Sequence, residues 1–149
     1  MGSDHAGYEL KEAVKSKLEA DGHEVNDVGT HSSESTDYPP FAAEAATLVS
    51  NGDAERGVIV CGSGNGVAIV ANKVPGIRAV NAHDVAEAEM ARRHNNINVV
   101  TLSGARLEPA EAGAIVDEFL SEDFEGGRHE RRVNEIAAIE REVESRNAG

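Results

Sequence analysis

The stretch of this sequence best suited to chemistry is a cysteine followed by alternating glycines. Residues 58–60 are apolar and β-branched and predict a buried strand. Cys61 follows this strand directly, and the chain then has glycines at Gly62, Gly64 and Gly66. Glycines at a strand-to-helix turn let the backbone approach a ligand and aim its amides at an anion. The pattern predicts an anion pocket with Cys61 at its mouth, and the alternative is a tight turn with an inert buried cysteine.

A nucleotide site fits the same stretch less well. The glycines follow G-x-G-x-G, whereas dinucleotide-binding turns carry G-x-G-x-x-G. The next predicted strand, residues 77–81, also begins too soon for the long helix of such a unit. No lysine follows at the position that a phosphate-binding nucleotide loop requires.

Two further pairs of polar residues stand at predicted element ends. Asp4 and His5 follow a possible strand at residues 1–3 and could bind a sugar hydroxyl or exchange protons; a helix-capping aspartate with a solvated histidine is the alternative. His94 and Asn95 end a predicted helix, where a C-terminal cap and a dipole-stabilised histidine are the simpler interpretation.

A basic segment near the C-terminus could bind phosphate. Arg128 and Arg132 lie one turn apart on a predicted helix, although a solvated helix face would show the same spacing. The sequence contains no Cys/His cluster with metal-ligand spacing, no G-x-S-x-G and no alternation of basic and aromatic residues. Metal-dependent hydrolysis, serine hydrolysis and RNA binding therefore have no support.

Composition narrows the class of protein. The 149 residues fit one domain, 1–149, and the net charge of −13 should repel nucleic acid and anionic membranes. A single cysteine excludes an intrachain disulfide and suits a reducing cytoplasm. Neither an 18-residue apolar run nor a secretory leader is present, so we expect a protein that neither spans a membrane nor is secreted.

Strand and helix patterns alternate along the chain. Strands are predicted at residues 23–28, 58–60, 77–81 and 97–102, with the tail of a first strand at 1–3. Helices are predicted at 8–21, 41–49, 84–93, 109–120 and 128–146, with a short one after the glycines. This order predicts an α/β fold, a doubly wound (Rossmann-like), mostly parallel five-stranded sheet with helices on both faces. Ligands bind such sheets at strand C-terminal ends, where Asp4, His5 and Cys61 would meet.

The last predicted helix has an apolar stripe within a highly charged sequence. The stripe consists of Val133, Ile136, Ala137, Ile139 and Val143, which recur at helical spacing between residues 128 and 146. We expect this stripe to dock on another surface, either of the same chain or of a partner.

Six motifs together resemble the ribose-5-phosphate isomerase B family, whose relatives include the galactose-6-phosphate isomerase subunits. They lie in order along nearly the whole chain, at residues 2–7, 36–39, 61–66, 71–73, 94–96 and 126–129. Each motif alone is weak, but their order and spacing make chance resemblance very unlikely. The resemblance implies an aldose–ketose isomerase that moves a proton between C1 and C2 of a sugar phosphate through an enediolate, without metal or cofactor.

Carried onto this sequence, the resemblance implies the role of each matching residue. Cys61 would be the proton-transfer base, His94 would open the sugar ring, and Ser63 with the loop amides would hold the enediolate oxygen. Some relatives lack the cysteine and carry a glutamate just after the glycines, where this chain has Val67 and Ala68, so it groups with the cysteine users. The remaining matches would bind substrate hydroxyls or phosphate: Asp4, His5, Gly62, Gly64, Asn65, Gly66, Asn95, Arg106, Arg128, His129 and Arg132.

The resemblance also implies partners and leaves the sugar open. We expect a cytoplasmic homodimer or homotetramer of the pentose phosphate pathway, with active sites shared between subunits and the C-terminal helix docked on a partner. Ribose 5-phosphate is the expected substrate; a hexose 6-phosphate such as galactose or allose 6-phosphate, or a non-catalytic sugar-phosphate-binding module, are the alternatives. Relatives carry several apolar residues before the Gly-Ser-Asp-His motif, where this chain has only Met1, so the first strand is expected to be truncated.

Overall fold

Apolar runs form the central strands of the sheet in the computed structural model, which describes residues 1–149. β2 (Gly57–Cys61) and β4 (Val99–Ser103) are buried throughout and pair in parallel along their whole length. β1 (Gly2–Ser3) pairs with β2 and β3 (Ala79–Asn81) pairs with β4, which gives the parallel order β1-β2-β4-β3. Because all strands run the same way, their C-terminal ends share one edge of the sheet, the C-terminal edge.

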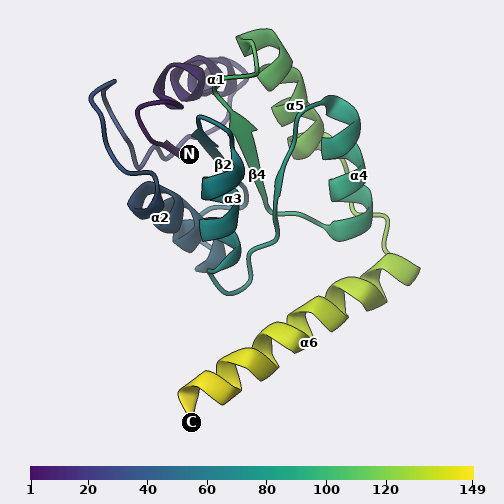
Figure 1. Cartoon of the computed structure of the whole chain (residues 1–149). Coiled ribbons are helices and arrows are strands. Elements are labelled where there is room, and N and C mark those ends of the chain that lie inside the picture. The colour runs from purple at the N-terminus through teal and green to yellow at the C-terminus, as the bar shows by residue number, and fades with distance from the viewer.

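Helices cover both faces of this sheet (Figure 1). α1 (Tyr8–Ala20), α4 (Val85–Asn95) and α5 (Pro109–Ser121) pack on one face, and α2 (Pro39–Ser50) and α3 (Asn65–Asn72) pack on the other. Successive strand residues point to opposite faces, so Val60 joins the first layer and Ile59 the second. The predicted doubly wound α/β fold is confirmed, with helix bounds close to those expected.

The predicted strand at residues 23–28 is wrong, and the sheet has four strands instead of five. The segment does run beside β1, because the amides of Val28 and Thr30 donate to the carbonyls of Met1 and Ser3 at 2.9 and 2.7 Å. Gly29, with φ of 106°, leaves the extended conformation and interrupts a regular ladder. The fully buried Lys11 holds the segment instead, with its Nζ 2.7 Å from the Thr30 carbonyl and bonded to the Asp27 carboxylate.

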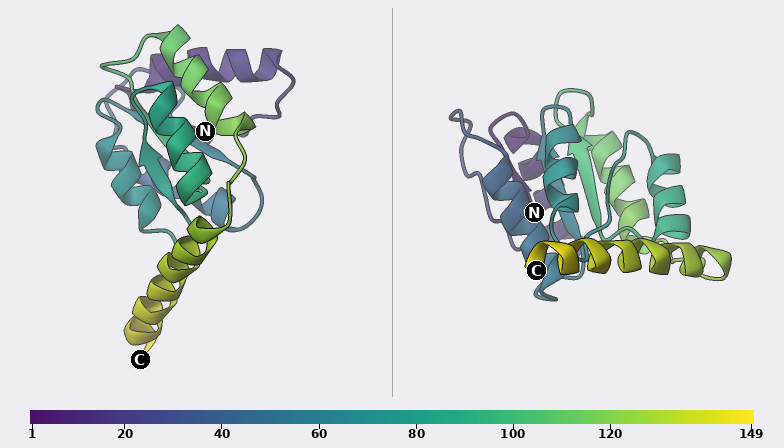
Figure 2. Two further views of the ribbon diagram at one scale, coloured as in Figure 1. Left: turned by 90° about the vertical axis from the view of Figure 1, so that its right-hand side faces the viewer. Right: turned by 60° about the horizontal axis from the view of Figure 1, so that its bottom comes forward.

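α6 (Arg128–Ala148) extends away from the two layers and lies below the edge where the strands begin (Figures 1 and 2). Val133 is buried at 8% exposure, whereas Ile136, Ile139 and Val143 are 49%, 62% and 40% exposed. The stripe predicted for this helix is therefore largely uncovered in one chain. Neither α6 nor any other helix has an apolar stretch long enough to cross a membrane.

Candidate active site

The turn after β2 points a backbone amide at the Cys61 sulfur. Cys61 is buried at 4% exposure, and the amide of Gly64 donates to its Sγ at 3.2 Å. Gly64 reaches this position with φ of 79°, a conformation that residues with a Cβ rarely adopt. An amide donor is a stronger partner for a thiolate than for a thiol, because hydrogen bonds to charged acceptors are stronger. The loop is thus arranged around the sulfur, with one of its amides aimed at it.

Polar side chains from β4 and β3 hold the glycine loop in place. Thr101 donates through Oγ1 to the Gly64 carbonyl at 2.8 Å, and Ser103 donates to the Gly62 carbonyl at 2.7 Å. Asn81 donates to the Ser63 carbonyl at 3.1 Å. No motif in the sequence indicated these three supports. Their signal was a polar residue within or at the end of an otherwise apolar strand, which needs a hydrogen-bond partner once it is buried.

Asp4 and His5 lie at the same edge as Cys61. Ser3 pairs with Val60, so Asp4 follows at the level of Cys61 on the neighbouring strand. One oxygen of the buried Asp4 accepts from the Gly7 amide at 2.9 Å, which is the capping role considered as an alternative. His5 Nδ1 accepts from the Thr36 amide at 3.1 Å, so the loop before α2 is tied to this edge.

Two other features of the C-terminal edge come from Tyr38 and the turn after β4. A Cβ at Gly66 would lie 2.4 Å from Cζ of Tyr38, so the glycine is required for this ring to pack on the start of α3. The amide of Gly104 donates to the Cys61 carbonyl at 2.8 Å, and the exposed Arg106 follows two residues later. Nine predicted site residues therefore share this edge. Four belong to the glycine loop and the start of α3, namely Gly62, Gly64, Asn65 and Gly66. We call the remaining five the cysteine group: Asp4, His5, Cys61, Ser63 and Arg106.

The other predicted residues gather where α4 ends and α6 begins, and we call them the histidine group: His94, Asn95, Arg128, His129 and Arg132. The rings of His94 and His129 stack with centroids 4.2 Å apart and planes 10° apart. His129 is buried, and its Nε2 has no hydrogen-bond partner. Burial, and to a lesser extent the adjacent His94 ring, hold the pKa of His129 below its ordinary value.

Glu125, which no sequence motif indicated, faces both imidazoles. Its carboxylate oxygens lie 3.8 Å from His94 Nε2 and 3.7 Å from His129 Nε2, and Arg93 pairs with it at 3.1 Å. His94, Glu125 and His129 offer three ligand atoms within 4.8 Å of one another. However, ring nitrogen lone pairs lie in the plane of the ring, and these two planes are nearly parallel, whereas tetrahedral zinc needs ligands that converge on one point. The arrangement therefore suits proton exchange better than metal binding.

One chain does not bring the cysteine and histidine groups together. α4 runs back from the end of β3 to the start of β4, so its last residues, His94 and Asn95, lie at the edge where strands begin. Cys61 lies at the opposite, C-terminal edge. In Figure 1 the arrow of β4 points away from α6, which shows the same separation.

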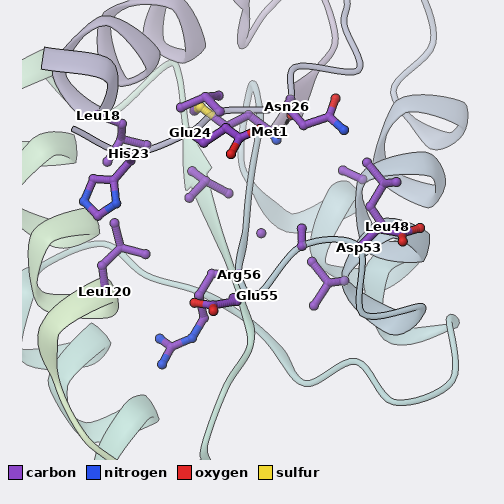
Figure 3. Close-up of a pocket in the computed structure, with 16 residues that line it drawn as sticks. Met1, Leu18, His23, Glu24, Asn26, Leu48, Asp53, Glu55, Arg56 and Leu120 are labelled. Carbon is purple, nitrogen blue, oxygen red and sulfur yellow. Dashed lines mark hydrogen bonds between the residues drawn. The ribbon is translucent and has the colours of Figure 1, made fainter. Parts of the chain in front are cut away.

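One cavity, of about 470 Å³, holds neither group and lies between the ends of α1, α2 and α5 (Figure 3). Leu18, Leu48 and Leu120 contribute apolar surface, while Glu24 and Glu55 contribute negative charge. The one arginine in its wall, Arg56, donates to the Phe119 carbonyl at 2.7 Å. An acidic wall disfavours a phosphorylated sugar, so this cavity is not the candidate site.

Comparison with known proteins agrees with the predicted resemblance. A family model described as Ribose/Galactose Isomerase matches residues 1–136. The ribose-5-phosphate isomerase B of Escherichia coli (strain K12) is 45% identical over 141 residues, 94% of each chain.

Solved structures of ribose-5-phosphate isomerase B share the fold. The Clostridium thermocellum protein is 44% identical with a TM-score of 0.93, over 95% of this chain and 96% of that one. The Mycoplasma genitalium protein with bound ribulose-5-phosphate is 40% identical with a TM-score of 0.90, over 95% of this chain and 94% of that one. With this much identity over nearly its full length, the chain belongs to the ribose/galactose isomerase family.

Proposed function

We propose that this protein interconverts ribose 5-phosphate and ribulose 5-phosphate. The observation that carries the proposal is the buried Cys61, which accepts a hydrogen bond from a glycine-loop amide at the C-terminal edge of the sheet. Two relatives support it: the ribose-5-phosphate isomerase B of Escherichia coli, and the Mycoplasma genitalium protein solved with ribulose-5-phosphate.

Cys61 is the base in the proposed mechanism. Its thiolate takes the proton from C2 of the open-chain aldose and returns it to C1, while the hydroxyl proton on O2 passes to O1. The negative charge of the enediolate develops on oxygen, where Ser63 and the amides of the glycine loop donate to it. One such donor is typically worth about 3 kcal/mol in the transition state, comparable with the base itself.

The histidine group binds the other end of the substrate. Arg128 and Arg132 lie one helical turn apart on α6, both exposed, and can hold one phosphate between them. Asn95 offers an amide for the hydroxyls, and His94 exchanges the proton that opens the furanose ring. His129 adds a further contact to the phosphate, and so do His5 and Arg106 of the cysteine group.

Two copies of the chain complete one site in this proposal. The cysteine and histidine groups lie at opposite edges of one sheet, so a single substrate can touch both groups only if a second copy supplies one of them. The uncovered stripe of Ile136, Ile139 and Val143 gives the copies an apolar surface on which to associate. We infer a homodimer, or a homotetramer built from it, working in a reducing cytoplasm that preserves the free thiol.

Isomerisation of a hexose 6-phosphate is the second candidate function, because the family model covers galactose isomerases as well. A pentose and a hexose phosphate differ by one CHOH unit, and the exposed loop before Tyr38 can accommodate a sugar of either length.

The test is to incubate the purified protein, with chelator added, with ribose 5-phosphate and separately with galactose and allose 6-phosphates, and to measure ketose formation. Turnover highest on ribose 5-phosphate supports the proposal, and highest on a hexose supports the second candidate. Binding of all three without turnover would instead identify a sugar-phosphate-binding module.

A further inference from the structure

Glu125 is fixed to the last turn of α4 from two directions. It lies in the segment between α5 and α6, and its backbone amide donates to the Arg93 carbonyl at 3.0 Å. Its carboxylate also pairs with the Arg93 guanidinium at 3.1 Å. Arg93 is held in turn by Glu89 at 3.0 Å. A carboxylate anchored through both its backbone and its side chain can adopt few other positions, although it is partly exposed.

The anchored carboxylate meets the same atom of two histidine rings. His94 and His129 each approach it through Nε2, at 3.8 and 3.7 Å, and the stacking of the rings restrains their rotation. Both separations exceed a hydrogen bond, so the carboxylate acts on the rings through its negative charge. This charge favours the form of His94 that carries its proton on Nε2, and this leaves Nδ1 on the other side of the ring free to accept.

Charges from both helices bear on this pair of rings. α4 contributes Arg93, α6 contributes Arg128 and Arg132, and Glu125 is the carboxylate that faces them. Two imidazolium charges with ring centroids 4.2 Å apart would repel each other strongly. Glu125 is the carboxylate placed to offset a positive charge on either ring.

We propose that Glu125 is the positioning residue of His94, which sets the Nε2–H form and leaves Nδ1 to exchange protons with the sugar. This rests on the proposed function only for the identity of the reaction. Ring opening moves one proton from the anomeric hydroxyl to the ring oxygen as the bond between C1 and the ring oxygen breaks. His94 Nδ1 takes the first proton and returns it to the ring oxygen, so the enzyme ends the step unchanged.

The first test reads the histidine rings directly and needs no turnover. Imidazole ¹⁵N chemical shifts of the full-length wild-type protein should show His94 as the Nε2–H form when neutral. In Glu125→Ala, His94 should become a mixture of the two neutral forms, and the pKa of His129 should fall further because an attractive negative charge is gone. Glu130→Ala, an exposed neighbour on the first turn of α6, should leave both unchanged. An identical His94 form in wild type and Glu125→Ala overturns the proposal.

The second test is kinetic. Glu125→Ala should lower kcat for ribose 5-phosphate by about tenfold to 100-fold, the usual loss for an orienting partner, with KM changed less than about threefold. Glu125→Asp should recover part of kcat, and Glu130→Ala should match the wild type. A changed His94 form with unchanged kcat contradicts a positioning role. If the wild-type protein turns over no sugar phosphate, the proposed function fails, while the ¹⁵N measurement still decides whether Glu125 sets the form of His94.

Discussion

The cysteine group and the histidine group are built on different supports. Cys61 ends a fully buried strand, and side chains of β4 donate hydrogen bonds to the glycine loop that follows. The geometry of the sheet therefore fixes the position of Cys61. His94 ends a helix and stacks on His129 at the start of another helix, which extends away from the sheet. The first group is rigid within one chain. The second depends on how α6 is held, and much of its apolar stripe still lacks a partner.

Removing the Cys61 sulfur should lower kcat more than any other substitution considered. Cys61→Ala should lower kcat by roughly 10²- to 10⁴-fold, the usual contribution of a positioned base. Binding of the sugar phosphate should survive, because the loop amides and the arginines remain. Steady-state kinetics and calorimetric titration of the variant measure the two effects. A kcat within about threefold of the wild type would assign the base to another residue, with Asp4 the next candidate.

A substitution in the histidine group should raise KM and leave the free energy of unfolding nearly unchanged. Arg132→Ala removes one charge-assisted contact to phosphate, so KM should rise about tenfold to 100-fold. The free energy of unfolding should change by less than about 0.5 kcal/mol, because the side chain is exposed. Arg131→Ala is the matched control, since its neighbouring guanidinium faces Glu135 at 3.9 Å. Equal KM values for the two variants would show that Arg132 is surface charge only.

The strand support of the glycine loop predicts a coupled loss of stability and rate. Thr101→Val keeps the side-chain shape but leaves the Gly64 carbonyl without its donor, so the free energy of unfolding should fall by about 1–3 kcal/mol. We also expect kcat to fall about tenfold, because the loop amides shift. Thr47→Val, which loses a bond to the Ala43 carbonyl on an exposed helix face, should change kcat little. Denaturant unfolding and kinetics of both variants separate these outcomes.

The smallest expected effect is a pH dependence of stability from His129. Its pKa is lowered in the folded protein by burial, from 6.5 in the unfolded chain, so below pH 6.5 the unfolded state binds the proton more readily. Stability should therefore fall as the pH drops below 6.5 and level off below the folded pKa. His129→Asn should weaken this fall, measured by denaturant unfolding at a series of pH values. A steeper fall in the variant contradicts the assignment.

Periodicity and motif order predicted the strands and helices that form the two layers. The predicted strand at residues 23–28 is the exception. These residues alternate like a strand, but the buried Lys11 holds the segment and Gly29 interrupts it. A contact between residues 11 and 30 leaves no trace in local periodicity. The same reason hid Glu125, whose partner His94 lies 31 positions earlier and meets it only through the packing of α4 against the segment before α6.

The most direct test of the shared site is to mix two inactive variants. Cys61→Ala lacks the sulfur of the cysteine group, and His94→Asn lacks the ring of the histidine group. If one site takes each group from a different copy, a mixed dimer has one intact site and one doubly damaged site. Co-refolding equal amounts should then restore about a quarter of wild-type activity, since half the dimers are mixed and half their sites are intact. Activity no higher than the average of the two separate variants would show that each site lies within one chain.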